Sequence, residues 1–379
     1  MSLYEDTLYN IKHNKQIRET GQLLAIPFHR MPKLSTVLPG IRKGMYSLIT
    51  AGTKESKSQL TNFMFIQQPV EYLYLHPDCG LDMKIKLFSL EISKEDFMAL
   101  SMAYRLYLEH GIIINPENLQ SIFEGYILDK QILDILESAS FQKYFEFFED
   151  KVEVIDNIKS PTGIMINAEG YARANGKIIY DQVTWDDGSI HNIIKEYVPN
   201  NPNQITQVIV DHATLLAEKG KTLYECIKVL SSDYFLKLKN TYKFAPCLVQ
   251  QQSAASTEMQ FTNRGDAILD KVKPSREGLS SNKDTAMDIN LMLGVFSPYK
   301  YKEPSYEGWD LTRLKDYHRE LSIMLNRNGR SNITEQLFFN GACGFFTELP
   351  LDADANTKLK VYQTADRYRQ LELSYTNNK

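Results

Sequence analysis

Cysteine is scarce in this chain of 379 residues, which contains four: Cys79, Cys226, Cys247 and Cys343. None of them forms a C-x-x-C pair, and no histidine stands at the spacing of a zinc ligand, so the sequence predicts no structural zinc site. Four isolated cysteines are typical of thiols that stay reduced and pack as small apolar groups. This usage favours a reducing, cytoplasmic compartment.

Long apolar runs are also missing. No segment approaches the roughly 20 apolar residues that a membrane-spanning helix needs. The N-terminal segment MSLYEDTLYNIKHNK is polar and contains acidic residues, unlike a signal peptide. We therefore expect no membrane association.

A strong charge of one sign is the third absence. The net charge is -4 and the isoelectric point about 6.0, which argues against a broad basic surface that coats itself with nucleic acid. A narrow basic channel remains compatible with these values. Hydrophobic residues make up 43% of the chain, enough for a large core in two or three domains or in one elaborated domain.

What is present is an alternation of apolar runs and amphipathic segments, the pattern of an α/β fold with a mostly parallel central sheet. The runs are continuous rather than alternating, as expected of strands buried on both faces. The predicted strands are 45–50, 85–90, 205–210, 246–250, 288–296, 321–325 and 333–339. The predicted helices are 3–20, 58–67, 94–109 and 223–239.

The remaining segments are less regular. Residues 110–204 are predicted to contain helices and one strand at the edge of the sheet. The polar stretch 253–286 is predicted to be a long loop, which inside a compact domain is usually functional or disordered. We expect three parts: an N-terminal linker helix or arm at 1–25, a core domain at 26–350, and a polar, peripheral tail at 351–379.

The segment AGTKESKS, residues 51–58, follows a predicted strand and precedes a predicted helix. Its spacing matches the phosphate loop G-x-x-x-x-G-K-[ST], with Ala51 and Ser56 at the two glycine positions and Lys57 and Ser58 at the last two. Backbone amides of such a loop bind phosphates, the lysine adds positive charge, and the hydroxyl binds Mg²⁺. Ser56 is a departure, because that turn favours glycine. The alternative is a polar turn that only caps a helix.

Polar side chains follow three other predicted strands. Asp211, Glu91 and the glutamines Gln250–Gln252 all stand where parallel strands deliver residues to the ligand-binding edge of a sheet. Asp211 is a candidate metal ligand, Glu91 a candidate for activating water, and a glutamine a candidate sensor of the γ-phosphate. Arg327 and Arg330 lie in a turn between the last two strands, where an arginine can reach the nucleotide of a neighbouring subunit. Each residue alone is equally compatible with a solvated strand end or turn.

Taken in order, these segments resemble the ATPase domain of the DnaB-type replicative helicases, a RecA-like P-loop NTPase fold. The resemblance spans 26–350 and rests on LPGIRKGMYSLITAG, FSLEISKEDF, ITQVIVDHATLL, APCLVQQQS and LNRNG. It implies ATP and Mg²⁺ as cofactors, a ring of commonly six identical subunits, and single-stranded DNA in the centre. Primase or a helicase loader would be possible partners, and the absence of the family's N-terminal domain fits a phage replication system in a bacterial cytoplasm.

The resemblance also assigns roles. Glu91 becomes the catalytic glutamate, Gln252 the sensor and Arg327 the arginine finger, with Lys57 as the fourth catalytic group. Ser58 and Asp211 would hold the metal. The nucleotide would be bound by Ala51, Gly52, Thr53, Lys54, Glu55, Ser56, Lys57, Ser58, Gln59, Asp211 and Arg330. One departure is Leu325, which stands where the family often has lysine.

DNA contacts are expected from positive side chains in the long polar loop, which can follow phosphates without reading sequence. These candidates are Arg264, Lys271, Lys273, Arg276 and Lys283. Two other functions stay open. One is a degenerate RecA-like protein that assembles or binds partners without hydrolysis, which Ser56 and Leu325 favour. The other is a different RecA-like DNA-dependent ATPase, a recombinase or a packaging motor.

Overall fold

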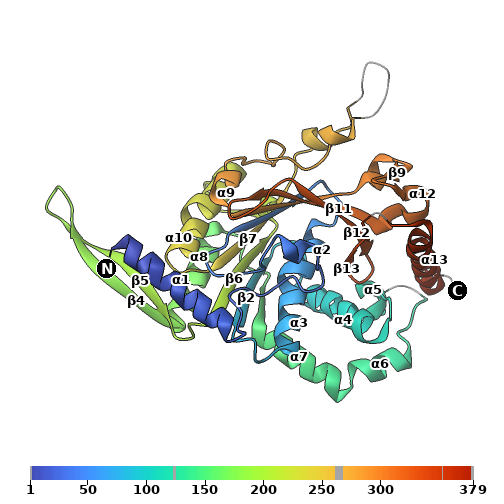
Figure 1. Cartoon of the computed structure of the whole chain (residues 1–379), viewed down its shortest axis with the longest axis horizontal. Helices are drawn as coiled ribbons and strands as arrows, with labels where there is room; N and C mark the ends of the chain where they lie inside the picture. The colour runs from blue at the N-terminus through green and yellow to red at the C-terminus, as the bar shows by residue number, and fades with distance from the viewer. Residues whose placement is uncertain (1, 123–124, 261–267, 352, 377–379) are drawn as a thin grey trace.

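The computed structural model describes residues 2–122, 125–260, 268–351 and 353–376 (Figure 1). Within them, one sheet of nine strands has the order β13-β12-β11-β8-β1-β7-β6-β2-β3. Its strands are β1 (Ser47–Ala51), β2 (Asp82–Ser89), β3 (Val152–Ile155), β6 (Gln204–Asp211), β7 (Ala245–Gln251), β8 (Leu291–Phe296), β11 (His318–Asn326), β12 (Ile333–Asn340) and β13 (Phe345–Glu348).

The strands from β8 to β3 are parallel, and β11, β12 and β13 extend the sheet in antiparallel pairs. The sequence prediction of a mostly parallel α/β sheet is therefore confirmed. Every residue of β1 is buried, and two adjacent residues of this strand, Leu48 and Ile49, pack in different hydrophobic clusters. The side chains of a strand alternate between faces, so these two clusters are the cores on the two sides of the sheet.

Helices cover both faces, as Figure 1 shows. One face carries α2 (Lys57–Asn62), α3 (Gln68–Leu75), α4 (Lys94–His110) and α7 (Ala139–Lys151), and the other carries α8 (Pro161–Ala174), α9 (Leu223–Lys228) and α10 (Leu236–Asn240). A π-helical turn, η2 (Phe63–Gln67), joins α2 to α3, and η4 (Val229–Phe235) joins α9 to α10. Short helices α5 (Pro116–Leu119), α6 (Lys130–Leu136) and α11 (Thr285–Asp288) lie in the connections.

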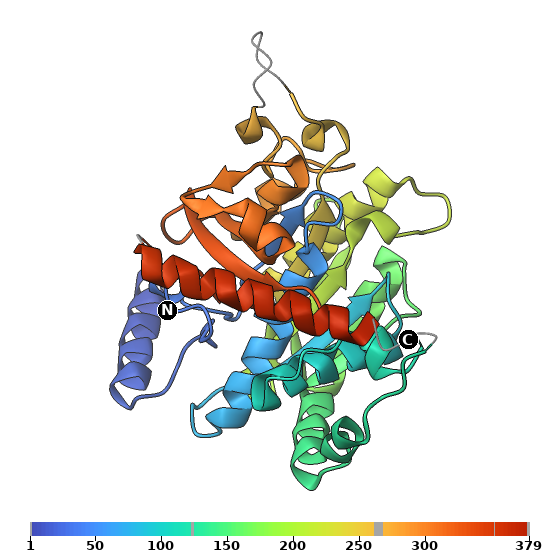
Figure 2. The same ribbon diagram turned by 90° about the vertical axis from the view of Figure 1, so that its right-hand side faces the viewer.

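The C-terminal segment differs from the expected peripheral tail. Residues Ala355–Thr376 form the long helix α13, which lies across the antiparallel end of the molecule (Figure 2). Ala365 and Tyr362 are buried there in a third cluster with α12 (Leu311–Leu314), and the Tyr368 ring packs on Phe338 of β12. The spacing of Tyr362, Ala365 and Tyr368 gives an otherwise polar helix one narrow apolar face.

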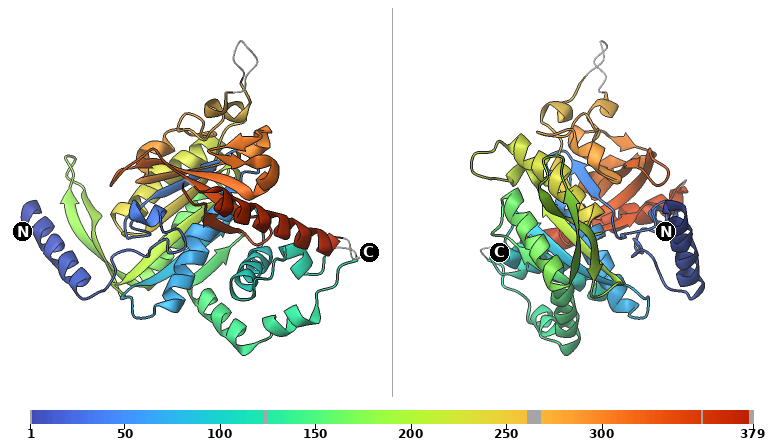
Figure 3. Two further views of the ribbon diagram at one scale, coloured as in Figure 1. Left: turned by 45° about the vertical axis from the view of Figure 1, so that its right-hand side comes forward. Right: turned by 90° about the vertical axis from the view of Figure 1, so that its left-hand side faces the viewer.

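Two elements extend away from the sheet (Figure 3). Helix α1 (Leu3–Glu19) begins at the predicted place with a capping box of Ser2 and Glu5, and none of its residues is buried. A hairpin of β4 (Gly176–Thr184) and β5 (Ile190–Pro199) forms a separate two-stranded sheet. The prediction for residues 110–204 had helices and one strand, so this hairpin is an addition to it.

The predicted burial of the thiols holds for Cys226, Cys247 and Cys343, while Cys79 is partly exposed. Among the residues that the structure describes, no helix combines the length and apolar character needed to cross a bilayer.

Candidate nucleotide-binding site

A cavity of about 990 Å³ opens at the carboxyl edge of the parallel strands. It collects the phosphate loop after β1, Glu91 after β2, Asp211 at the end of β6 and Gln251 at the end of β7. Its size lies within the range of small-molecule sites, and its place is the one where open α/β sheets bind ligands. The sequence prediction that these residues meet at one edge therefore agrees with their placement.

The phosphate loop turns from β1 into α2 through two residues in the left-handed conformation, Lys54 at φ 61° and Ser56 at φ 69°. Left-handed residues alternating with right-handed ones turn successive backbone amides toward one point, which creates an anion site. The serine in the second glycine position thus adopts the conformation that glycine usually provides. Lys57 lines the cavity, and among the described residues its ammonium group makes no hydrogen bond or ion pair.

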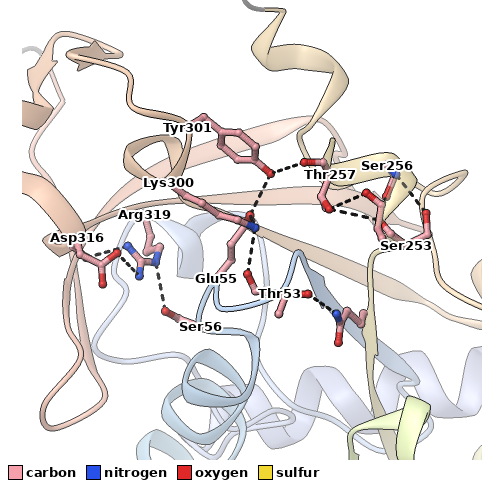
Figure 4. A network of polar contacts seen from close by, with 12 residues as sticks. Thr53, Glu55, Ser56, Ser253, Ser256, Thr257, Lys300, Tyr301, Asp316 and Arg319 are labelled. Atoms are coloured by element: carbon pink, nitrogen blue, oxygen red, sulfur yellow. Dashed lines mark hydrogen bonds and ion pairs between the residues drawn. The ribbon is translucent and has the colours of Figure 1, made fainter. Parts of the chain in front are cut away.

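The floor of the loop is Glu55, whose side chain is 1% exposed. Its carboxylate accepts hydrogen bonds from Lys300 Nζ at 2.9 Å and Tyr301 Oη at 3.3 Å, and burial raises the pKa of this carboxyl group (Figure 4). Gly52 packs closely against it, because a Cβ there would lie 2.6 Å from the Glu55 carboxylate and would force that side chain to shift. Glu55 therefore supports the loop from below and does not face the cavity.

Ser58 and Asp211, which the sequence predicts as ligands of a metal ion, are in contact with each other. Ser58 Oγ donates to Asp211 Oδ1 at 3.0 Å. Burial raises the pKa of Asp211 to about 6, although the Ser58 hydroxyl and the Lys57 charge oppose the shift. Mg²⁺ prefers one or two protein oxygens together with phosphate oxygens and water, so this donor set fits that ion. Among the described residues, no group of three or more His, Cys, Asp or Glu side chains is placed to hold a metal ion.

Glu91 lies at the cavity wall with 55% of its side chain exposed, and its carboxylate is 3.4 Å from His212 Nε2. Burial lowers the pKa of His212, and the nearby Lys57 charge acts in the same direction. Nδ1 of the imidazole is 2.6 Å from the Thr214 hydroxyl. This arrangement leaves a Glu91 oxygen open to the cavity beside a ring that orients it.

The side chains of the three glutamines at the end of β7 point alternately to the two faces of the sheet. Gln250 and Gln252 are buried and bind the segment 275–282, Gln250 to two backbone oxygens and Gln252 to Ser275. Gln251 faces the other way and donates to Thr53 Oγ1 in the phosphate loop. The predicted sensor, Gln252, therefore lies outside the cavity lining, and Gln251 is the glutamine within it.

No protein-family model and no curated protein matches the chain. Two solved structures resemble it over 92% of its length, each with a TM-score of 0.60 and 15% identity. The first is the ATPase domain of G40P, all of which is covered. The chain has the fold of a DnaB-like helicase ATPase domain. The second structure is a DnaB-like replicative helicase described with its interactions with primase, of which 67% is covered.

In this DnaB-like fold, Arg327 and Lys57 lie at opposite ends of the sheet. Asn326 pairs with Leu291 at the start of β8, whereas the phosphate loop follows the end of the parallel strand β1. Arg327 Nε donates to the Ile289 carbonyl at 2.7 Å. The two cations can therefore act on one nucleotide only between two copies of the chain.

The other residues of the turn are placed as follows. Arg330 is exposed beyond Arg327. Leu325 is partly buried against the hydrophobic cluster of one sheet face. An apolar side chain fits that position, although the family resemblance would place a lysine there.

The predicted DNA-binding residues differ in their surroundings. Lys271, Arg276 and Lys283 are exposed on the connection between β7 and β8, while Arg264 lies outside the described residues. Lys273 is partly buried, with ion pairs to Asp270 at 3.4 Å and Glu320 at 3.5 Å. Because its charge is already neutralised, Lys273 is the weakest of these candidates.

Arg319 and His212 line the cavity and were not named in the sequence interpretation. Arg319, at the start of β11, is 1% exposed and reaches the phosphate loop. His212 directly follows Asp211, the predicted metal ligand. The only signal in the sequence was an arginine next to a predicted buried strand, where a charged side chain needs a specific partner.

Proposed function

We propose that the protein is a subunit of an ATP-dependent DNA helicase that moves on single-stranded DNA and unwinds duplex. The observation that carries the proposal is the convergence of Lys57, Ser58, Asp211 and Glu91 on one cavity. They lie at the carboxyl edge of a sheet whose fold is shared with DnaB-like ATPase domains. They come from three separate places in the chain, the phosphate loop with Lys57 and Ser58, the end of β2 with Glu91 and the end of β6 with Asp211, so their meeting is not a consequence of local sequence.

The roles follow from the geometry. Loop amides from Thr53 to Ser58 and the Lys57 ammonium group would bind the β- and γ-phosphates. Mg²⁺, held by Ser58 Oγ and the Asp211 carboxylate, would neutralise phosphate charge. Glu91, with 55% of its side chain exposed in the cavity, would orient the attacking water. Gln251 is the better placed γ-phosphate sensor, because its side chain contacts Thr53 of the loop and lines the cavity, whereas the side chain of Gln252 does neither.

The assembly we propose is a homo-hexameric ring. Arg327 lies at the far edge of the sheet, so it would complete the site of an adjacent copy, with Arg330 beside it. Lys271, Arg276 and Lys283 are exposed and would face single-stranded DNA in the ring. A primase or a loader is a further candidate partner, and the work of such a ring would place the protein in the cytoplasm of a bacterial host.

The test is ATP hydrolysis with and without single-stranded DNA, together with the particle mass in solution. We expect DNA-stimulated hydrolysis by a hexamer, and at least a 100-fold loss of turnover for Lys57→Ala, because a phosphate clamp acts in the transition state. Lys143→Ala, which removes an exposed lysine of α7, is the matched control and should hydrolyse ATP normally.

The outcomes separate the candidate functions. Undiminished turnover by Lys57→Ala would remove the proposal. Nucleotide binding without hydrolysis would instead support a degenerate protein with an assembly role, which the apolar Leu325 favours. DNA-dependent hydrolysis with strand exchange, or without unwinding, would point to a recombinase or a packaging motor.

A further inference from the structure

Ser56 holds a conformation that its side chain disfavours. Its backbone is left-handed, at φ 69° and ψ 26°, directly before the first residue of α2. For a residue with a Cβ, this region is roughly tenfold less populated than the right-handed one. Something outside the loop must therefore stabilise it, because the loop amides are oriented for phosphate only in this conformation.

The stabilising contact comes from a distant part of the chain. Arg319 Nε donates to Ser56 Oγ at 3.2 Å, across 263 positions of sequence. Its Nη1 donates to the carbonyl oxygens of Asp316 and His318, both at 2.8 Å, and its Nη2 lies 3.0 Å from the Asp316 carboxylate. Besides Ser56, two backbone carbonyls and the Asp316 carboxylate bind the planar guanidinium, and together they direct Nε at the serine (Figure 4).

The site around Arg319 is buried. The side chain is 1% exposed, and its guanidinium carbon lies 4.7 Å from the centre of the Phe339 ring. A hydrogen bond from a charged donor in such surroundings is stronger than one at the surface. The same segment of chain also supplies Lys300, which donates to Thr53 O at 3.0 Å and to Glu55. The loop is therefore held on two sides, by Lys300 after β8 and by Arg319 at the start of β11.

We infer that Arg319 is a positioning residue for the phosphate loop, which keeps Ser56 left-handed and so sets the loop amides for a nucleotide's phosphates. This inference rests on the proposed function and extends it. It explains how the loop can tolerate serine where the phosphate-loop pattern has glycine. The contact that Arg319 makes to the loop is to the Ser56 hydroxyl, so its effect on nucleotide binding must depend on residue 56.

A purely structural role for Arg319 predicts something different. Loss of a buried arginine would then lower the melting temperature and weaken binding equally, whatever side chain occupies position 56. A positioning role predicts coupling: the two residues contribute one shared effect, and a glycine at position 56 makes Arg319 dispensable for nucleotide affinity. A double-mutant cycle measures this coupling directly.

The experiment measures the Kd of a fluorescent, non-hydrolysable ATP analogue with Mg²⁺ for the full chain, and the melting temperature of each variant. Ser56→Ala and Arg319→Met should each raise Kd about tenfold, because each removes the same charged hydrogen bond. The double variant should bind no more weakly than either. Ser56→Gly should bind at least as well as the unchanged protein, and Arg319→Met in that background should change Kd less than about threefold.

The controls make each result decisive. Arg313→Met removes an arginine of α12 that stacks on Tyr362, away from the cavity, and should leave Kd unchanged. If Arg319→Met does not fold, Ser56→Ala and Ser56→Gly still decide the matter, since neither disturbs the core. Unchanged affinity of Ser56→Ala, or additive effects in the cycle, overturns the inference alone. An unchanged protein with no affinity for the analogue overturns the proposed function instead.

Discussion

Gln251 and Gln252 are neighbours with opposite surroundings, so substituting each in turn gives a sharp prediction. The Gln252 side chain is 2% exposed and has three hydrogen bonds, to Thr50 Oγ1 at 2.9 Å and to the Ser275 carbonyl and amide at 3.0 and 3.2 Å. Gln252→Ala leaves these buried partners without the glutamine. Each buried polar group left without a partner costs about 1–3 kcal/mol, and water relieves part of this cost. We therefore expect the free energy of unfolding to fall by about 2–4 kcal/mol.

Gln251→Ala should do the reverse. This side chain is only partly buried and its one hydrogen bond is to Thr53, so we expect a stability change within about 0.5 kcal/mol. If Gln251 contacts the γ-phosphate, kcat should fall about 100-fold, as for other removed transition-state donors. Urea denaturation and steady-state ATP hydrolysis of both variants provide the assay. A stable but inactive Gln252→Ala beside a fully active Gln251→Ala would refute the reasoning.

Three other predictions concern charge. Burial would raise the pKa of Glu71, but hydrogen bonds and charge from Arg30 and His29 lower it to about 2. Glu71→Gln should therefore lower the free energy of unfolding, measured by chemical denaturation, by about 3 kcal/mol above pH 5. The difference from the unchanged protein should vanish as the pH falls from 4.5 to 2. Mg²⁺ must displace the proton of Asp211, whose pKa is raised to about 6. The Mg²⁺ affinity measured by calorimetry should therefore rise about tenfold per unit of increasing pH below pH 6 and level off above it. A flat profile would contradict the raised pKa. Arg276→Ala should weaken single-stranded DNA binding and reduce its salt slope by about one, whereas Lys273→Ala, whose partners are carboxylates, should affect stability more than affinity.

The sequence predicted the central strands well because their composition determines their place. Runs such as 205–210 are apolar on both faces, and only a parallel sheet covered by helices satisfies them. The hairpin of β4 and β5 lacks that signal. Most of its residues are exposed or half-exposed, so no buried face imposes a visible period on the sequence. The helix α13 was missed for a related reason, because its apolar face is only about one residue wide.

The sequence could predict only those residues of the candidate site that stand at the ends of buried strands. An aspartate or glutamate at the end of a buried parallel strand lies at the carboxyl edge of the sheet, and Asp211, Glu91 and Lys57 line one cavity there, while their roles remain predictions. The choice among Gln250, Gln251 and Gln252 depends on which face of β7 each residue occupies, and a shift of one residue reverses it. Arg319 reaches the loop through the antiparallel pairing of β11 with β8, and the sequence does not reveal that register.

Strand β11 also joins two places that otherwise have no direct connection. Its second residue, Arg319, touches the phosphate loop of its own chain, and Arg327 follows its last residue. Nine extended residues span roughly 30 Å, and β11 pairs with β12 from His318 to Ile323 and with β8 from Glu320 to Asn326. In a ring with a nucleotide between neighbours, a small tilt imposed at one end would be delivered to the adjacent protomer's nucleotide at the other. Under the proposed assembly, β11 would link the phosphate loop of one copy to the nucleotide of the next.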